Sequence, residues 1–246
     1  MAVLELANIS KHFGAIQAVS DVSLTIARGE AVGLMGDNGA GKSTLVKMIA
    51  GNFLPSSGTI RIDDREVVLH KPVEARRHGI EIVHQDLALC DNLTAAANVF
   101  LGRERRRRVG PISVLDHGAM AKRAGELFRD LKSETRPRDL IRQMSGGQRQ
   151  AVAIARTMLA DAKLVLMDEP TAAISVRQVA EVLNHINHLK AQGISVVLIS
   201  HRMPDVFEVT DRIIVLRRGR KVADKPTGAS SPEEITGLIT GAIETV

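Results

Sequence analysis

The chain has 246 residues, of which 44% are hydrophobic and 25% are charged, and its formal net charge is +5. This composition is typical of a globular protein, and the length allows one large α/β domain or two small ones. The single cysteine, Cys90, excludes an internal disulfide, and the apolar runs are too short for a membrane-spanning helix. No secretion signal opens the sequence, so we expect a protein of the reducing cytosol.

Much of the positive charge lies in one arginine cluster, Arg103 and Arg105–Arg108. Such a cluster is usually a solvated loop face, and the alternative is attraction to the acidic headgroups of a membrane. Nucleic acid is not expected as a partner, because base stacking needs aromatic side chains and none of the five phenylalanines lies in the cluster. The sequence leaves the role of the cluster open.

The first predicted elements are antiparallel strands up to about Ala27, where apolar and polar residues alternate. Short, nearly continuous apolar runs follow, and they predict strands that are buried on both faces, as in a parallel sheet. These runs are Ala31–Met35, Ile80–Val83, Leu164–Met167, Val196–Ile199 and Ile213–Leu216.

Apolar residues at helical spacing predict helices across 120–131 and from Val176 to a stop at Gly193. Residues from about 100 to 160 show no strand pattern, which indicates a helical insertion. A last helix is expected after Ser231, with Pro232 at its first position and Glu234 closing a capping box. We therefore predict a β flank plus α/β core over about 1–93 and 161–246, with a helical subdomain over about 94–160.

A phosphate-binding loop is predicted directly after the first buried strand. The segment GDNGAGKST matches the P-loop pattern and leads into the helix-like LVKMIA. Its glycines let backbone N–H groups wrap around phosphates, its lysine supplies a positive charge, and its serine offers a hydroxyl to Mg²⁺. The alternative is a glycine-rich turn with an incidental lysine. The candidate nucleotide-binding residues are Gly36, Asp37, Asn38, Gly39, Ala40, Gly41, Lys42, Ser43 and Thr44.

Two carboxylates follow the apolar run Leu164–Met167, in the segment KLVLMDEP. Ligands of open α/β sheets bind at the carboxyl ends of the strands. We expect Asp168 to hold Mg²⁺ and Glu169 to act as the general base toward water. Without the P-loop nearby, the same acids would be read as the start of a turn.

A second glycine-containing helix start occurs in MSGGQRQ, about a hundred residues after the P-loop. Two glycines expose backbone N–H groups there and Ser145 adds a hydroxyl, so the segment is a second phosphate-binding end. One γ-phosphate does not need two such ends from one chain. We therefore expect Ser145, Gly146, Gly147 and Gln148 to cap a nucleotide held by a partner subunit, rather than to be a simple helix cap.

The order GDNGAGKST, Gln85, MSGGQ, LVLMDEP and SHRM resembles the nucleotide-binding subunits of ABC transporters, from about Leu4 to Arg218. The resemblance implies a single ATP-binding domain across 1–246, an α/β fold with a RecA-like core, an antiparallel β flank and an inserted helical subdomain. It also implies a head-to-tail homodimer. Two ATP molecules would lie between the P-loop of one chain and the signature segment, Ser145–Gln148, of the other.

The resemblance assigns roles to three further residues. Gln85 matches the glutamine that senses the γ-phosphate, Mg²⁺ and the membrane partner, and His201 matches the histidine that contacts the γ-phosphate. Phe13 matches the aromatic position that stacks on adenine. Taken alone, Gln85 would be a solvated loop residue, His201 would be satisfied in a local turn, and Phe13 would belong to the core.

Two departures from the family pattern stand out. Met144 replaces the usual leucine before the signature, a swap that conserves volume. Ser175 stands where most members have an aspartate in a loop that links the two sites, which leaves the coupling between the sites open. The monosaccharide importers of the family commonly lack this aspartate. Two further segments also resemble the ATPases of these importers: NLTAAANVFLGRE and SHRMPDVFEVTDRIIVLRRGR.

The resemblance therefore implies an ATPase that uses ATP and Mg²⁺ to drive uptake of a simple sugar. The protein would sit at the cytoplasmic face of the membrane, as a homodimer bound to permease subunits and, through them, to an extracytoplasmic sugar-binding protein. The alternatives are import of another small solute, a non-transport ABC ATPase, or a regulatory subunit with weak hydrolysis. The sequence names neither the solute nor the oligomeric state without ATP.

Overall fold

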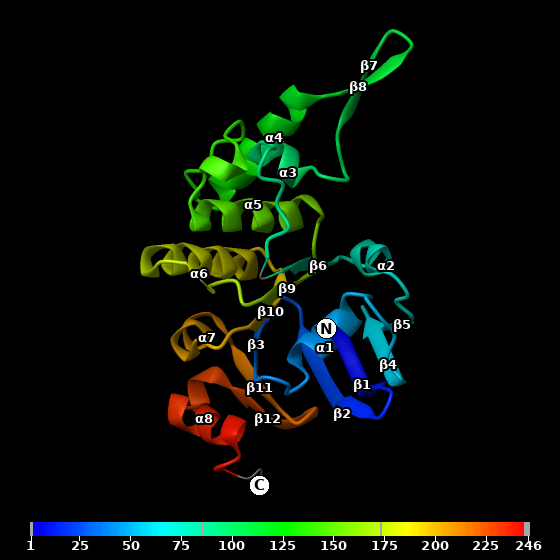
Figure 1. Ribbon diagram of the computed structural model, residues 1–246, viewed down its shortest axis with the longest axis vertical. Helices are drawn as coiled ribbons and strands as arrows, with labels where there is room; N and C mark the ends of the chain where they lie inside the picture. The colour runs from blue at the N-terminus through cyan, green and yellow to red at the C-terminus, as the bar shows by residue number, and fades with distance from the viewer. Residues whose placement is uncertain (1, 85, 173, 244–246) are drawn as a thin grey trace.

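The computed structural model describes residues 2–84, 86–172 and 174–243. The molecule is elongated, with helices α3, α4 and α5 at one end and helix α8 at the other (Figure 1). Between the two ends lies a six-stranded sheet in the order β12-β11-β3-β10-β9-β6. Across the described ranges, no helix is long and apolar enough to cross a membrane.

The five strands predicted from apolar runs are confirmed and pair in parallel. They are β3 (Ala31–Met35), β6 (Ile80–Val83), β9 (Leu164–Asp168), β10 (Ser195–Ile199) and β11 (Arg212–Arg217). A sixth strand that was not predicted, β12 (Arg220–Pro226), pairs antiparallel with β11 at the sheet edge.

Alternate residues of each buried strand belong to different cores. In β10, Val196 and Leu198 pack into a core shared with the helices, whereas Val197 and Ile199 pack into a core shared with the β flank. A strand that is covered on both faces needs apolar side chains at consecutive positions, which is why these strands read as continuous apolar runs.

The predicted antiparallel flank is confirmed as a four-stranded sheet, β2-β1-β4-β5. The first two strands form a long hairpin, and the other two come after the P-loop helix. Their bounds are β1 (Ala2–Phe13), β2 (Ile16–Ala27), β4 (Ser57–Ile62) and β5 (Arg65–Val67). The flank and helix α1 (Lys42–Ile49) bury one face of the main sheet, and the short helix α2 (Pro72–Arg77) precedes β6.

Helices cover the other face of the sheet and form the far end of the molecule (Figure 1). Those of the inserted part are α3 (Ala95–Val99), α4 (His117–Asp130) and α5 (Gly146–Leu159), with a 3₁₀ turn at Ile141–Gln143. The remaining helices are α6 (Val176–Ala191), α7 (Met203–Val209) and α8 (Pro232–Thr240), with a 3₁₀ turn at Thr227–Ala229.

The insertion differs from the sequence prediction in one respect, because it contains a β-hairpin. Strands β7 (Arg106–Val109) and β8 (Ile112–Leu115) pair antiparallel with each other and with no other named strand in the described part of the chain. Three consecutive arginines interrupt the expected alternation of apolar and polar residues, so the strand pattern was hidden.

The last helix begins as predicted but is capped differently. The Ser231 hydroxyl accepts a hydrogen bond from the N–H of Glu234 at 3.2 Å. The Glu234 carboxylate does not complete the expected capping box, because it pairs with the ammonium of Lys225 on β12. Helix α8 is therefore tied to the edge strand by an ion pair in addition to its buried face.

Helix α6 buries a histidine against the helical core. His185 is 4% exposed, and burial, assisted by the nearby His188, lowers its pKa to about 4. The unfolded chain restores the ordinary histidine pKa of about 6.5. Between these two values the unfolded state binds more protons than the folded state, so the free energy of unfolding falls as the pH falls.

We predict that acidification from about pH 7 to about pH 5 lowers the free energy of unfolding by about 2 kcal/mol through His185. Urea denaturation at a series of pH values measures this loss. His185→Leu should flatten the pH dependence, whereas His70→Gln, at an exposed position, should leave it unchanged. Equal slopes for the wild-type protein and His185→Leu would contradict the assignment.

Candidate functional site

The loop between β3 and α1 is shaped by glycines at its two ends. Gly36 has φ +149°, and a Cβ there would lie 2.3 Å from the carbonyl oxygen of Leu216. Gly41 has φ +101°, and a Cβ there would lie 2.7 Å from the carbonyl oxygen of Ala18. Neither position has room for a side chain, so the loop is held tightly between β11 and the flank hairpin.

Lys42 folds back over this loop. Its Nζ donates hydrogen bonds to the carbonyl oxygens of Gly36 at 2.6 Å and Asp37 at 3.0 Å. Burial lowers the pKa of the ammonium, although nearby carboxylates, Glu169 first among them, oppose the shift. Because the ammonium is held by neutral acceptors, a phosphate would offer it a stronger, charge-assisted contact.

The end of β9 places two carboxylates beside the loop. Asp168 is the last residue of the strand, and Glu169 follows in a left-handed conformation with φ +52°. The N–H of Glu169 donates to the carbonyl oxygen of Ile199, at the end of the neighbouring strand β10, at 2.9 Å. This contact turns the Glu169 side chain toward the residues that follow β10.

His201 meets Glu169 at this sheet edge, although the two are 32 positions apart in the chain. The imidazole Nε2 lies 3.0 Å from Glu169 Oε1, and the N–H of His201 donates to Oε2 at 3.3 Å. Burial raises the pKa of the Glu169 carboxyl, and the two contacts to His201 partly offset that rise. The glutamate is thus a partly desolvated carboxylate whose position is set by a histidine.

One cleft of about 500 Å³ brings most of these residues together. Of the sequence-predicted residues, its lining includes Asn38, Gly39, Ala40, Gly41, Lys42, Ser43, Thr44, Asp168, Glu169 and His201. Ile16, Gln17, Ala18 and Ile199 also line it and were not predicted. The three flank residues could have been suspected from their place in the hairpin that carries Phe13.

A larger cavity of about 670 Å³ lies against the same loop but away from Glu169 and His201. It shares Asn38, Gly39 and Ala40 with the first cleft, and it takes in Asp37 together with Arg217, Arg218 and Arg220. Of these two cavities, the smaller cleft is the one that holds the lysine, both carboxylates and the histidine.

Phe13 stands outside the cleft lining. It ends β1, is 47% exposed, and meets Phe53 edge to face with 5.3 Å between ring centroids. Lys11 Nζ lies 5.3 Å from the centroid of the Phe13 ring. An exposed ring beside Ile16, which does line the cleft, is compatible with a base platform, and its role stays a prediction.

The signature segment is built as a helix cap. Ser145 Oγ accepts a hydrogen bond from the N–H of Gln148 at 3.2 Å, and the Gln148 amide oxygen accepts from the N–H of Ser145 at 3.0 Å. The hydroxyl hydrogen of Ser145 remains able to donate. Gly146 and Gly147 lie against the start of α6, where an added Cβ would meet Ile174 and Glu181.

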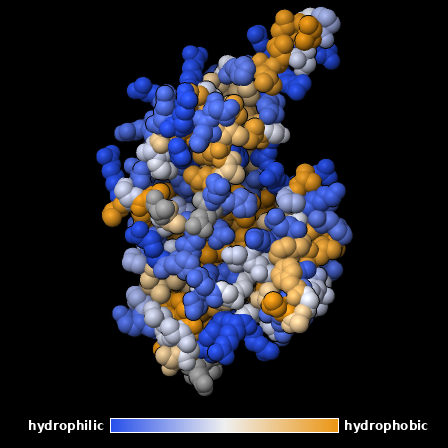
Figure 2. All heavy atoms as spheres, in the orientation of Figure 1, coloured by the Kyte–Doolittle hydropathy of each residue, from blue (hydrophilic) through white to orange (hydrophobic). Residues whose placement is uncertain are grey.

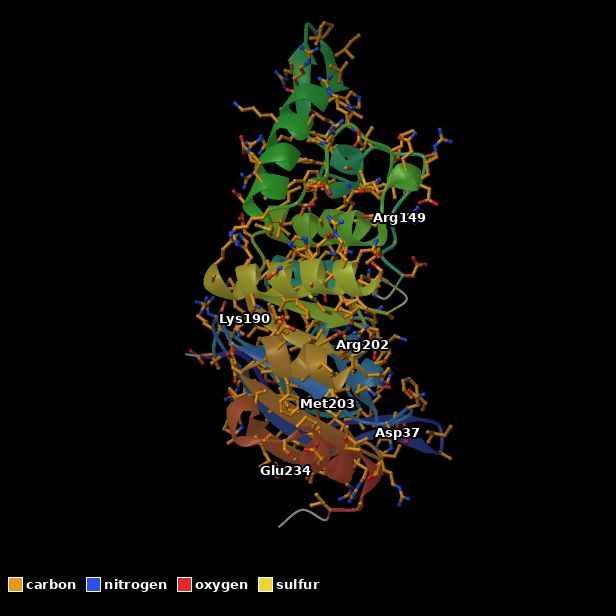
Figure 3. All side chains as sticks on the ribbon, turned by 90° about the vertical axis from the view of Figure 1, so that its left-hand side faces the viewer. Asp37, Arg149, Lys190, Arg202, Met203 and Glu234 are labelled. Carbon is orange, nitrogen blue, oxygen red and sulfur yellow. The ribbon has the colours of Figure 1, made fainter. Side chains whose placement is uncertain are left out.

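This segment does not reach the cleft of its own chain. None of its residues lines the Lys42 cleft. Figure 3 shows Asp37 of the loop and Arg149 of α5 well separated along the length of the molecule, with Arg202 and Met203 between them. Gln85, which was also predicted for the site, lies outside the described residues. Ser175 is the N-cap of α6.

Known proteins with a similar sequence belong to one family. The model of the ABC transporter family matches residues 19–172. The chain is 41% identical to the xylose/arabinose import ATP-binding protein XylG of Sulfolobus acidocaldarius, over 97% of this chain and 94% of the relative. It is 39% identical to the ribose import ATP-binding protein RbsA of Geobacillus kaustophilus, over 97% of this chain but 48% of the relative.

The chain thus spans about half the length of several relatives and nearly the full length of another. A nucleotide-free ATP-binding cassette from an ABC transporter superposes with a TM-score of 0.83, at 26% identity, covering 98% of this chain and 96% of that one. A dimeric cassette bound to ADP and Pi superposes with a TM-score of 0.73, at 28% identity, covering 91% and 98%. The predicted fold class is therefore confirmed.

We predict that Lys42→Ala weakens binding of a fluorescent ATP analogue by about 10- to 100-fold, because a charge-assisted contact to phosphate is lost. Lys47→Ala is the matched control: it removes a lysine from the same helix, at an exposed position outside the cleft. Equal affinities of the two variants would place the phosphates elsewhere.

Proposed function

We propose that this chain, which belongs to the ABC transporter family, binds and hydrolyses ATP to drive the uptake of a simple sugar. Hydrolysis is supported by one arrangement above all, the Glu169–His201 pair in the cleft that also holds Lys42. Sugar uptake is supported by the likeness to a xylose/arabinose import protein over nearly the whole of both chains.

The chemistry follows from the position of each group in the cleft. Lys42 and the loop N–H groups bind the phosphates of ATP. Glu169 accepts a proton as the oxygen of a water molecule attacks the γ-phosphorus, and ADP departs as the bond to the γ-phosphate breaks. His201 holds the carboxylate and contacts the γ-phosphate. A raised pKa makes Glu169 a stronger base than an ordinary carboxylate.

The cleft also suits Mg²⁺. This ion prefers a few oxygen ligands from protein and takes the others from phosphates and water. The Ser43 hydroxyl and the Asp168 carboxylate, which both line the cleft, would hold it, with Gln85 as the third proposed ligand. When bound, Mg²⁺ would neutralise the charge that develops on the phosphate oxygens.

A second copy of the chain would complete each site. The Ser145 hydroxyl is exposed at a helix N-terminus, where it can meet a phosphate held by another chain. This arrangement explains why one chain carries two phosphate-binding ends that do not meet. A related cassette is dimeric after hydrolysis, with ADP and Pi bound.

The permease would dock beside the signature helix. A groove of about 280 Å³ there is lined by Leu87, Leu89 and Arg149, together with Asp86 and Asp91. Leu87 and Leu89 pack only partly against the core, so each retains apolar surface that a membrane subunit can cover.

Glu169→Gln should retain ATP binding and lose nearly all hydrolysis, because an amide cannot take the proton. Release of phosphate, and uptake of labelled xylose, ribose and galactose in vesicles containing the permease, measure both parts of the proposal. Hydrolysis without uptake of any of the sugars would keep the ATPase and reject the transport assignment.

The rate of phosphate release by the wild-type protein should fall on acidification at a higher pH than an ordinary carboxylate would give, since burial raises the pKa of the Glu169 carboxyl.

Mixing two inactive variants should restore hydrolysis. Lys42→Ala disables the loop, and Ser145→Asp keeps a good helix cap but sets a carboxylate against the partner's phosphate. Half of randomly mixed dimers have one intact site, so up to about a quarter of the wild-type rate should return. Ser145→Asn, which caps equally well without the charge, is the control. Full activity of Ser145→Asp by itself would rule out the shared site.

A further inference from the structure

The hairpin of β7 and β8 is the most isolated part of the described chain. It projects from the helical end of the molecule, away from the flank and the sheet (Figure 1). Its two strands pair only with each other, through Arg106–Leu115, Arg107–Val114, Arg108–Ser113 and Val109–Ile112. An isolated two-stranded hairpin is at best marginally stable in water, so contact with another surface would stabilise it.

The base of the hairpin is anchored to the body. Arg103 forms an ion pair with the buried Glu81 at 2.6 Å, and the Arg105 guanidinium lies 5.8 Å from the ring centroid of Phe100. The N–H of Asp116 donates to the carbonyl oxygen of Arg105 at 2.8 Å, which closes the hairpin. Arg103 thus has a structural role, and the remaining arginines of the cluster lie beyond this anchor.

Charge and apolarity are separated along the hairpin. Residues 105–115 contain four arginines and no acidic residue, and within the described ranges none of these arginines has an ion-pair partner. Next to the Gly110–Pro111 turn, Val109 and Ile112 are 51% and 63% exposed. Figure 2 shows this hydrophobic tip at the end of the molecule, with hydrophilic residues beside it.

We infer that the β7–β8 hairpin docks on a membrane surface rich in acidic phospholipids. The apolar tip would enter the boundary between headgroups and acyl chains, while Arg106, Arg107 and Arg108 meet the phosphates. Three residue steps separate the tip pair from the Arg106–Leu115 pair, which is about 10 Å at strand spacing. This length matches the depth to which interfacial segments penetrate.

The chemistry of the hairpin disfavours nucleic acid. Binding to single strands depends on aromatic platforms for the bases, and residues 105–115 contain none. Exposed valine and isoleucine side chains at a turn gain nothing from a phosphate backbone, but they do gain from transfer into an apolar layer. Docking of the hairpin on a membrane requires neither the solute nor the permease, so failure to dock would leave the proposed ATPase and transport function standing.

Co-sedimentation of the purified full chain with vesicles tests the charge contribution. Binding is expected to phosphatidylglycerol–phosphatidylcholine vesicles, to be weak on pure phosphatidylcholine, and to decline as salt is raised. Replacing Arg106, Arg107 and Arg108 with glutamine should weaken binding by about 100-fold, since each arginine near an acidic surface contributes about fivefold. Glutamine at the exposed Arg65, Arg77 and Arg138 is the control and should change little.

Fluorescence tests insertion, because the chain contains no tryptophan. Ile112→Trp introduces a single probe at the tip, whose emission should shift to the blue on acidic vesicles. Val68→Trp, on the distant flank and 61% exposed, should not shift. Absence of vesicle binding, equal binding by the two triple variants, an unshifted Ile112→Trp spectrum, or arginine-dependent binding to DNA or RNA in place of vesicles would each overturn the inference.

Discussion

The parallel register of β3, β10 and β9 is the constraint on which the site depends. Parallel neighbours end at the same edge of a sheet, so the loop after β3, the two carboxylates at the end of β9 and the histidine after β10 lie close together. The N–H of Glu169 then bonds to the last residue of β10, which fixes the approach of Glu169 to His201. The order of the strands brings these side chains together, and the helices and the flank stabilise that order by burying the two faces of the sheet.

The same sheet unites the two ends of the molecule. Because consecutive residues of one strand point to opposite faces, β10 contributes Val196 to the core of the helical end and Val197 to the core of the flank. The signature helix α5 belongs to the first core through Val152 and Ile154. Its position relative to the Lys42 cleft is therefore set by packing against the sheet rather than by contact with the cleft itself.

The parts that could be predicted from sequence are those with a local physical signature. Buried parallel strands show continuous apolar runs, and the P-loop shows glycines at fixed spacing, so the sheet core and the Lys42 loop were both recognised. Strand β7 was missed because its arginines conceal the alternation, and the Lys225 partner of Glu234 was missed because it comes from another element. The lining by Ile16, Gln17 and Ala18 depends on how the flank folds over the loop, and the only sequence signal for it was their place in the hairpin that carries Phe13.

The left-handed backbone at Glu169 has a consequence for the balance between stability and activity. A residue with a side chain is strained there by roughly 1 kcal/mol, and glycine is not. Glycine, which suits this backbone conformation, has no side chain to accept a proton. Glutamate, which supplies a carboxylate to the cleft, is strained in it. Glycine at this position would therefore stabilise the fold but remove the proposed base, so selection for stability alone would act against the proposed hydrolysis.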